Sequence, residues 1–353
     1  MTPRCFALTL VDAVRFARSR NATDLHLEAD APAAVRIDGV LQAVDERPVA
    51  GEEVDALAAE LLKSRHFGAD EGDVSVAWSD DELGTLRGHV FRSNAGVTVA
   101  IRLFPRAIPA LDTLDLPQCV AELVERQRGL ILVAGPTGSG KSTTLAALVD
   151  RINARAAKRI VTIEDPIEYR HKNRRSFVTQ REIGRDTPSL AAALHGVLRS
   201  DPDVIVVGEL RDCAAVRGAL TAAETGHLVL ATVHTGDAPQ TVERMIDAFE
   251  GAAASHVRAQ LASVLLGVTC QRLVRRADGK GRRAVVEVMI GTDGVKNLIR
   301  DGKTHQLGNA IATGRQHGMQ TMAQHVAELL HTRRIEASAA AEIGVAHDLE
   351  RAG

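Results

Sequence analysis

The chain has 353 residues, of which 45% are hydrophobic and 3% aromatic, and its 43 Lys and Arg residues nearly balance 45 Asp and Glu residues. The formal net charge of −2 gives no overall attraction to nucleic acid or anionic lipid, so any such contact needs a local patch. Four scattered cysteines without a CxxC pair indicate neither a disulfide framework nor a cysteine zinc site, and they favour a reducing cytoplasm. The longest apolar stretch without charge, residues 259–270, is shorter than the roughly 20 residues that cross a bilayer and predicts a buried helix. Asp12 closely follows the short apolar stretch after Arg4, so we expect no signal peptide.

The first hundred residues predict a small α+β unit. Residues 10–20 have the apolar spacing of an amphipathic helix, and short runs of alternating apolar and polar residues follow. Asp38-Gly39 separates two of these runs and predicts a tight hairpin, because a type I′ turn needs positive φ at both central residues. The unit ends near Pro105. Its other predicted elements are strands at 24–28, 34–37, 40–44, 86–91 and 97–104 and a helix at 52–64.

Pro105, Pro109 and Pro117 mark a short connector, after which strands alternate with helices as in a parallel α/β sheet. The predicted strands are nearly continuous in Val, Ile and Leu, which suits strands that are covered on both faces. From Ala238 onward the pattern is mostly helical, with one strand-like interruption at residues 282–290. The predicted parallel strands are 130–134, 160–163, 204–207 and 227–232.

Residues 135–142 have the spacing G-x-x-x-x-G-K-[ST] between the predicted strand 130–134 and a predicted helix at 142–153. In such a P-loop the backbone N–H groups and the helix N-terminus face phosphates. We expect Lys141 to reach the β- and γ-phosphates of ATP and Ser142 to ligate Mg²⁺. The predicted nucleotide-binding residues of the loop are Gly135, Pro136, Thr137, Gly138, Ser139, Gly140, Lys141, Ser142 and Thr143.

Two predicted strands end in carboxylates. Gly208 follows the strand 204–207 at the position where the second phosphate-site motif of P-loop ATPases usually has Asp, and Glu209 comes next. Glu209 is therefore the best candidate for polarising the attacking water or for holding a water bound to Mg²⁺. Glu164 closes the strand 160–163, and ligands bind at the carboxyl ends of strands in open α/β sheets. The sequence does not divide the catalytic and Mg²⁺-binding roles between Glu164 and Glu209.

Residues 225–235 place one histidine at each end of a predicted strand, His227 and His234. Each imidazole is a candidate for sensing the γ-phosphate or relaying its presence to a neighbour, and an ordinary packed or surface histidine is the alternative. A zinc site is not favoured, because no further ligands stand at a usable spacing.

Together, four blocks resemble the Walker A, Asp box, Walker B and His box of the secretion-superfamily ATPases. The blocks are residues 135–142, 164–168, 201–212 and 225–235. Residues 22–28 and 36–39 are similar to the smaller domain of that superfamily, so the resemblance covers nearly the whole chain. Within the superfamily, Gln180-Arg181-Glu182 and residues 222–226 look most like the type IV pilus retraction ATPases, the PilT-like family.

The resemblance implies an α/β protein with a small PAS-like α+β domain over residues 1–107 and a linker over 108–117. A RecA-like P-loop ATPase core over 118–290 and a mainly helical region over 291–353 are expected to follow. It also implies a homo-hexameric motor that uses ATP and Mg²⁺ to turn an inner-membrane pilus platform protein and depolymerise pilin. Such a motor would lie in the cytoplasm, at the cytoplasmic face of the inner-membrane pilus machine, with only peripheral membrane contact.

The resemblance also extends the candidate site. It adds His234 to the catalytic residues and His227 to the nucleotide-binding residues. Arg87 and Arg102 match arginines with which the family's small domain reaches a neighbouring subunit's phosphates. Further family arginines align with Thr85 and near Ala95, so this chain has fewer such donors. The retraction signature reads Gly294-Val295-Lys296-Asn297-Leu298-Ile299-Arg300-Asp301, with lysine where the family has arginine, which keeps the charge but loses the bidentate geometry.

Other functions stay open at this point. The smaller number of these arginines is compatible with an accessory subunit that binds nucleotide and modulates a paralogous retraction ATPase. A pilus assembly or type II secretion ATPase is less favoured, because the further N-terminal domain and the tetracysteine zinc insertion of that group are not found. A nucleic-acid motor is disfavoured by the near-neutral charge and by the absence of a basic strip with aromatic residues. The sequence does not specify the pilus system, the ring symmetry, the direction of work or the turnover rate.

Overall fold

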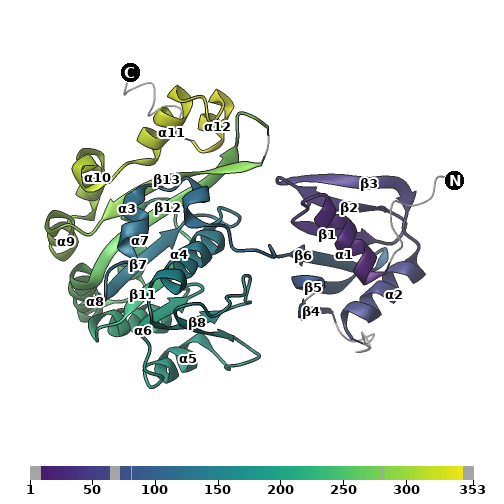
Figure 1. Cartoon of the computed structure of the whole chain (residues 1–353), viewed down its shortest axis with the longest axis horizontal. Helices are drawn as coiled ribbons and strands as arrows, with labels where there is room; N and C mark the ends of the chain where they lie inside the picture. Colours follow the sequence, from purple (N-terminus) through teal and green to yellow (C-terminus); the bar gives the residue numbers. More distant parts are fainter. Residues whose placement is uncertain (1–8, 64–71, 81, 280, 345–353) are drawn as a thin grey trace. The chain divides into compact units, whose positions relative to one another are not determined.

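The computed structural model describes residues 9–63, 72–80, 82–279 and 281–344 (Figure 1). The chain forms two compact units, Met1–Ala107 and Ile108–Gly353, each of which is described here by itself. Residue 64 of the predicted helix 52–64 and residues 345–353 of the predicted C-terminal region lie outside the described residues.

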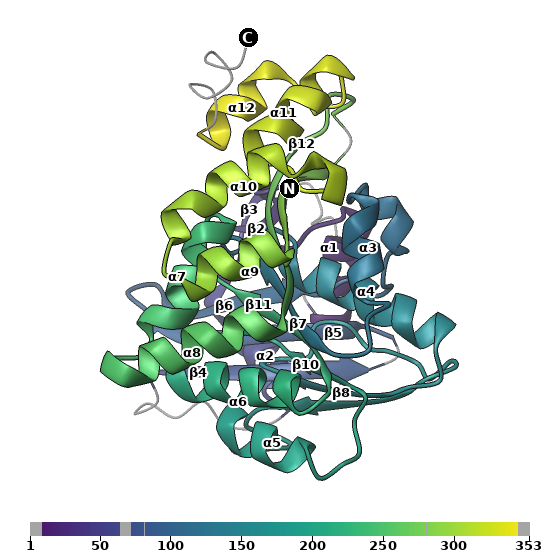
Figure 2. The same ribbon diagram turned by 90° about the vertical axis from the view of Figure 1, so that its left-hand side faces the viewer.

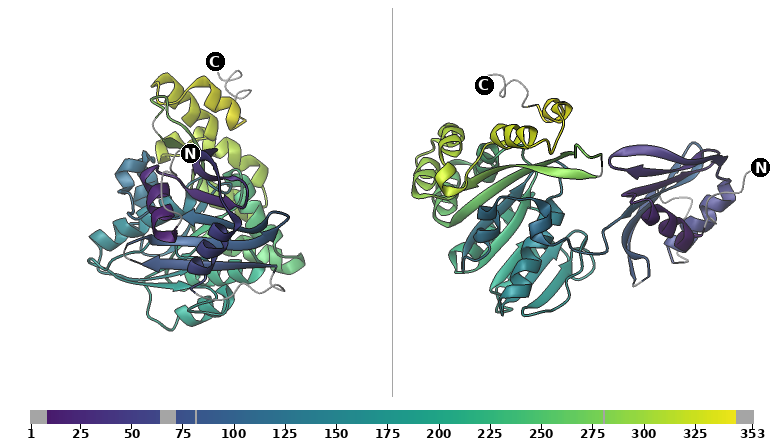
Figure 3. Two further views of the ribbon diagram at one scale, coloured as in Figure 1. Left: turned by 90° about the vertical axis from the view of Figure 1, so that its right-hand side faces the viewer. Right: turned by 45° about the horizontal axis from the view of Figure 1, so that its top comes forward.

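The first unit is a six-stranded antiparallel sheet in the order β3-β2-β1-β6-β5-β4, with α1 and α2 packed on one face (Figures 1 and 3). The Thr9 hydroxyl caps α1 by accepting a hydrogen bond from the Asp12 amide, and Leu10, Val14 and Ala17 bury the helix face at helical spacing. The elements are α1 (Leu10–Ser19), β1 (Asp24–Glu28), β2 (Pro32–Ile37), β3 (Val40–Pro48), α2 (Gly51–Leu61), β4 (Asp73–Asp80), β5 (Gly84–Ser93) and β6 (Gly96–Leu103).

The predicted hairpin is confirmed, and one strand of this unit was missed. Asp38 and Gly39 have φ values of +48° and +86°, as a type I′ turn requires, and Ile37 pairs with Val40 across the turn. The missed strand is β4, which lies at the edge of the sheet and pairs only with β5 among the described strands. An edge strand that is only partly buried carries a weak apolar signal.

The second unit is built on a seven-stranded sheet in the order β13-β12-β7-β11-β10-β8-β9 (Figure 2). All neighbouring pairs are parallel except β12 with β13. The strands are β7 (Gly129–Ala134), β8 (Arg159–Glu164), β9 (Phe177–Glu182), β10 (Val204–Val207), β11 (Leu228–Val233), β12 (Leu265–Arg275) and β13 (Arg282–Ile290). β7, β10 and β11 are buried at every position, as their continuous apolar sequences predict.

Helices cover both faces of this sheet. α3 and α4 pack on one face, α5 to α10 form the core on the other, and α11 and α12 pack against β12 and β13. The α-helices are α3 (Gln118–Leu123), α4 (Lys141–Arg155), α5 (Leu190–Val197), α6 (Cys213–Glu224), α7 (Ala238–Asp247), α8 (Gly251–Val264), α9 (Asp293–Arg300), α10 (Leu307–Thr313), α11 (Met322–His331) and α12 (Ala337–Glu342). Short 3₁₀ turns lie at Leu111–Leu114, Thr304–Gln306 and Arg315–His317. The predicted α/β fold, with an α+β unit first and a mainly helical end, is thus observed.

One sequence interpretation needs correction. The apolar stretch 259–270 is not one buried helix, because α8 ends at Val264 and β12 begins at Leu265, where it pairs with β7 and β13. Beyond Val264 the backbone groups pair with β7 on one side and with β13 on the other, so the sheet satisfies them in place of a helix. The predicted linker 108–117 packs with the second unit, where Leu111 is buried. Within the described residues, no helix is both long and apolar enough to cross a membrane.

Candidate functional site

The carboxyl ends of four parallel strands meet at one edge of the seven-stranded sheet. Val207 pairs with Ile163 and Ala231, and Val233 pairs with Ala134. The residues that follow each strand therefore emerge side by side, as in other open α/β sheets that bind ligands at this edge. These are the P-loop after β7, Glu164 at the end of β8, Glu209 after β10 and His234 after β11.

The P-loop runs from β7 directly into α4. Its crest, from Pro136 to Gly138, is exposed, whereas Ser139 and Lys141 are buried. Lys141 Nζ donates hydrogen bonds to the carbonyl oxygens of Gly135 at 2.7 Å and Pro136 at 2.9 Å. Burial lowers the pKa of Lys141, and the nearby charges of Glu209 and Glu168 oppose this shift. The ammonium group is thus held inside the curl of its own loop, close to the carboxylates of the same edge.

Thr143 and Tyr169 connect the P-loop helix to the segment after β8. Thr143 Oγ1 and Tyr169 Oη lie 2.7 Å apart, and Tyr169 is 5% exposed. Burial raises the pKa of the phenol, and the hydrogen bond to Thr143 opposes that rise. The neighbouring Ser142 is half-buried in the first turn of α4.

Glu164 is a desolvated carboxylate held by two donors. Its Oε1 accepts hydrogen bonds from Thr162 Oγ1 at 2.6 Å and from Gln180 Nε2 at 2.9 Å. Thr162 and Gln180 are register partners on β8 and β9, so both donors come from the same row of the sheet. Burial raises the pKa of Glu164, while these two hydrogen bonds oppose the rise.

Gly208 explains why the usual aspartate is displaced in this chain. A Cβ at Gly208 would lie 3.3 Å from Glu164 Cα and 3.3 Å from the Ile163 carbonyl oxygen, which is tighter than ordinary van der Waals contact. The end of β8 therefore approaches β10 closely, and a larger residue at this position would require the backbone of β8 to shift. The available carboxylate is that of the next residue, Glu209.

Glu209 is held by one cation and one imidazole. Arg211 Nε donates to Glu209 Oε2 at 2.7 Å, and His234 Nε2 lies 3.2 Å from Glu209 Oε1. The hydrogen bond to Glu209 raises the pKa of the Arg211 guanidinium, and the charge of Asp165, 3.6 Å away, raises it as well. His234 thus lies at the same edge of the sheet, in contact with Glu209.

His227 lies elsewhere. Its backbone carbonyl accepts a hydrogen bond from Gly129 at the start of β7, so it stands at the amino-terminal edge of the sheet. Its Nδ1 is 2.9 Å from the Ala222 carbonyl oxygen and 3.2 Å from Thr225 Oγ1. His227 precedes β11 and His234 follows it. The whole length of this extended strand separates them, so they lie at opposite edges of the sheet. The structure does not bring His227 to the P-loop of its own subunit.

Arg87 and Arg102 lie on the first unit, on the sheet face opposite α1 and α2. They are register partners on β5 and β6, and the row continues through Asp24 on β1 to Arg36 on β2. Arg102 Nε donates to Asp24 Oδ1 at 2.9 Å, and the Arg102 side chain is 59% exposed. The neighbouring residue Leu86 is buried, as alternation along a half-covered sheet requires. The row presents three guanidinium groups and one buried carboxylate.

This architecture is matched along nearly its whole length by known proteins. The family model described as "Type II/IV secretion system protein" matches residues 9–348. The chain belongs to this family, and it is an ATPase. It is 39% identical over 317 residues to the type IV pilus retraction ATPase PilT of Pseudomonas aeruginosa, covering 89% of this chain and 92% of PilT.

Two further comparisons agree. An uncharacterised protein of Escherichia coli, YggR, is 44% identical over 319 residues, covering 90% of this chain and 97% of YggR. A crystal structure of the pilus retraction motor PilT with bound ADP has a TM-score of 0.86 and 40% identity, covering 98% of this chain and all of that one. The predicted family, fold class and ATPase activity are confirmed by these matches.

The candidate site contains hard oxygen donors that suit Mg²⁺. The described residues contain no cluster of three or more His, Cys, Asp or Glu side chains that would hold a metal alone. Mg²⁺ in nucleotide sites is held by one or two protein oxygens together with waters and phosphates. The hydroxyl of Ser142 and the carboxylates of Glu164 and Glu209 fit that donor set.

Several residues of this candidate site were not assigned a role from the sequence. Thr162 and Gln180 hold Glu164, Tyr169 contacts Thr143, and Arg211 holds Glu209. The sequence contained one usable signal, because Thr162 stands two residues before Glu164 and side chains at that spacing share a strand face. Gln180 was recognised only as part of a family marker, since its partner is 16 residues away on another strand.

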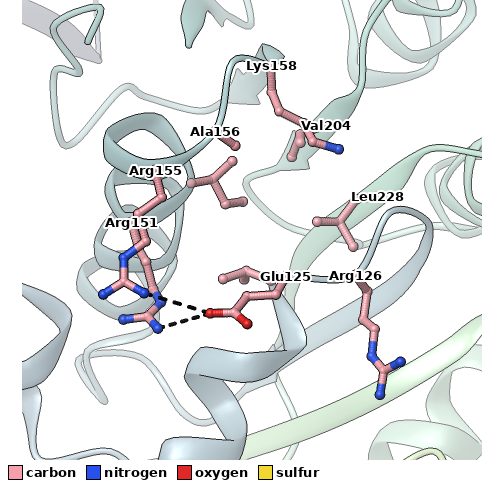
Figure 4. A pocket seen from close by; sticks show the side chains of 10 residues that line it. Glu125, Arg126, Arg151, Arg155, Ala156, Lys158, Val204 and Leu228 are labelled. Carbon is pink, nitrogen blue, oxygen red and sulfur yellow. Dashed lines mark hydrogen bonds and ion pairs between the residues drawn. The ribbon is translucent and has the colours of Figure 1, made fainter. Parts of the chain in front are cut away.

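A cavity of about 240 Å³ lies at the amino-terminal edge of the same sheet, away from the P-loop (Figure 4). Val204 and Leu228, the first residues of β10 and β11, help to form its apolar wall. Arg151 and Arg155 from the end of α4 point toward Glu125, which lies 3.1 Å and 3.8 Å from them. This cavity contains none of the predicted nucleotide-site residues.

Proposed function

We propose that the chain is a Mg²⁺-dependent ATPase motor that drives retraction of a type IV pilus. The observation that carries the proposal is the match to PilT over nearly the full length of both chains, in sequence and in structure. The site is compatible with it, because Lys141, Glu164 and Glu209 gather at the one sheet edge where the P-loop opens. Phosphoryl transfer needs positioning and charge stabilisation, which these groups supply.

In this proposal Glu164 activates the attacking water. A carboxylate whose pKa is raised by burial takes a proton from water more readily than an ordinary glutamate does. Thr162 and Gln180 both donate to Oε1 and hold the carboxyl group in place at the edge where the water would bind. The lysine of the loop would move from the Gly135 and Pro136 carbonyl oxygens to the phosphates when nucleotide binds.

Glu209 is proposed to hold a water of the metal ion and not to activate the attacking water. Both of its carboxylate oxygens already have partners, Arg211 and His234, so both are engaged within the protein. It is better suited to hold a water of the metal ion and to pass a change at the γ-phosphate on to His234. Ser142, Glu164 and Glu209 would hold Mg²⁺, directly or through water, and the ion would neutralise charge on the phosphates.

The arginine row of the first unit is proposed to complete the site of a neighbouring subunit in a homo-hexamer. Arg102 and Arg87 are register partners, and Arg102 is oriented by Asp24, so the two guanidinium groups are presented together. Arg36 lies in the same row and was not counted among the candidate donors from the sequence. It offsets part of the loss at Thr85 and near Ala95. An arginine supplied in trans is worth roughly 10³–10⁵ in turnover where it is fully functional.

Phosphate release from the purified full chain tests the ATPase and the ring together. Turnover per subunit should rise with protein concentration and be lost in Lys141→Ala. The arginine role is tested by mixing Lys141→Ala with the double variant Arg87→Ala and Arg102→Ala, each inactive alone. If the arginines act across subunits, mixed rings contain some intact sites, and activity returns on mixing.

A mixture that stays inactive while wild type is active would contradict action in trans. Arg47→Ala, at an exposed position on β3, is the matched control and should keep wild-type turnover. Binding of ATP without turnover at any concentration would favour the accessory-subunit alternative, in which the chain modulates a paralogous retraction ATPase.

The biological side of the proposal places the chain in the cytoplasm, at the cytoplasmic face of the inner-membrane pilus machine. Its proposed partner there is the inner-membrane platform protein, and no nucleic-acid partner is proposed. Loss of the chain from its host should leave assembled pili on the cell surface and abolish twitching. Equal or reduced surface pilin in the deletion strain would instead favour a role in assembly or secretion.

A further inference from the structure

Gln271 on β12 lies directly behind the P-loop. Its side chain is 1% exposed, and its Nε2 donates a hydrogen bond to the Ser139 carbonyl oxygen at 2.6 Å. β12 runs parallel to β7 with Cys270 opposite Ala134, so Gln271 is the next residue along, where the loop begins. None of the roles proposed for the P-loop residues requires this contact.

The loop closes on Gln271 at both of its ends. A Cβ at Gly135 would lie 2.4 Å from the Gln271 carbonyl oxygen and 2.5 Å from Ser139 Oγ. A Cβ at Gly140 would lie 3.1 Å from Gln271 Nε2. The first and last glycines of the loop therefore leave the space that Gln271 and Ser139 fill.

The side-chain amide of Gln271 is only partly satisfied by hydrogen bonds, which costs stability. Gln271 Oε1 and Ser139 Oγ are buried, and neither has a hydrogen-bond partner among the described residues. Unpaired buried polar atoms destabilise a fold, and an apolar side chain of similar size would avoid the unpaired oxygen. The donor on Nε2 is the group that such a replacement would lose.

That donor fixes the direction of one peptide plane. In a planar trans peptide the C=O and the following N–H point in opposite directions. The Ser139 carbonyl points back to Gln271, so the Gly140 N–H points to the opposite side of the peptide. This is the side of the loop on which P-loop amides meet phosphate oxygens.

We propose that Gln271 is a positioning residue for nucleotide binding, which acts by holding the Ser139–Gly140 peptide so that the Gly140 N–H faces the phosphates. This rests on the proposed nucleotide site at the P-loop. Gln271 itself touches the loop and not the nucleotide. Without its amide, the Ser139–Gly140 peptide is free to rotate, and each rotated loop must be reordered when phosphate binds.

The test is a titration of the full chain with a fluorescent N-methylanthraniloyl derivative of ADP, which needs no turnover. Gln271→Leu should raise the dissociation constant roughly ten-fold, the effect of losing about one buried hydrogen bond. Gln320→Leu is the matched control, because Gln320 Nε2 also donates to a backbone carbonyl of this sheet, that of Val286, at 3.0 Å. It should bind the ADP derivative as wild type does.

A second variant separates positioning from simple loss of stability. In Gln271→Glu, an ionised carboxylate would face the Ser139 carbonyl oxygen without a donor, whereas a protonated carboxyl group donates one. The ratio of its dissociation constant to that of wild type should therefore fall as the pH is lowered from about 8 to about 6. Loss of packing alone would leave that ratio independent of pH.

The outcomes are distinct. Wild-type affinity in Gln271→Leu, or a pH-independent ratio in Gln271→Glu, would overturn the proposal while leaving the nucleotide site standing. Wild-type protein that does not bind the ADP derivative at all would overturn the nucleotide site and, with it, the role of Gln271. If Gln271→Leu does not fold, the pH dependence of Gln271→Glu decides the matter.

Discussion

The Tyr169 hydroxyl lies 2.7 Å from the Thr143 hydroxyl and joins the first turn of α4 to the segment that follows Glu164. Because Tyr169 is almost fully buried, the hydrogen bond is protected from competition with water.

Tyr169→Phe should lower the free energy of unfolding by about 1 kcal/mol, since it removes this hydrogen bond and leaves the ring in place. Thr143→Val removes the other partner. In a double-mutant cycle, the two losses should not add, and the double variant should cost less than their sum. Urea unfolding of the four proteins measures this, and strictly additive losses would show that the two hydroxyl groups do not interact.

Removing the charge of Glu164 should stabilise the protein at neutral pH. Burial raises the pKa of this carboxyl group in the folded state, so its stabilising contribution is present below the unfolded-state value of about 4.3 and is lost as the pH rises through the raised value. Glu164→Gln has no such titration. The free energy of unfolding of wild type should therefore fall relative to Glu164→Gln between about pH 4 and neutral pH.

Urea midpoints of both proteins across this range provide the measurement. The same Glu164→Gln protein should have turnover reduced at least roughly 10²-fold, the usual contribution of a general base. A variant that is inactive but shows the same pH profile of stability as wild type would mean that Glu164 is not desolvated.

Restoring the usual aspartate should not help this chain. Gly208→Asp and Gly208→Ala both place a Cβ 3.3 Å from Glu164 Cα, and overpacking of this kind costs about 1–3 kcal/mol. Turnover should fall with stability, because Glu164 must shift. Gly308→Ala is the control, since a Cβ there meets nothing within 4 Å in helix α10 and should be neutral or stabilising. Wild-type turnover in Gly208→Asp would contradict the close contact.

Asp24→Asn should reduce turnover without weakening nucleotide binding at the P-loop. Asp24 is 8% exposed and orients Arg102 through its Oδ1, so its loss frees a guanidinium that is otherwise held in place. We expect turnover to fall roughly ten-fold through misplacement of the arginine. Phosphate release and titration with the ADP derivative separate the two effects. An equal loss of affinity would mean that the first unit had been damaged more generally.

The parts predicted well from the sequence were those encoded locally. The P-loop and the Asp38-Gly39 turn are recognisable because all of their interacting residues stand within a few positions of one another. The change from α8 to β12 was missed because residues 259–270 form one apolar run with no proline at the boundary. Strand β9 is largely polar and lies at the sheet edge, so it carried no strand signal, and Gln180 was consequently not linked to Glu164.

The position of β12 bears on how this chain can be shortened. β12 separates β7 from β13 and pairs with both, so the strand that carries the P-loop has no free edge. A fragment that stopped at Val264 would keep every residue of the proposed catalytic edge but expose the backbone of β7 along one side. A buried Leu-Ile-Leu-Val sequence with an open edge is a template for pairing with other chains. Such a fragment would be expected to aggregate, so β12 is needed to keep the ATPase soluble.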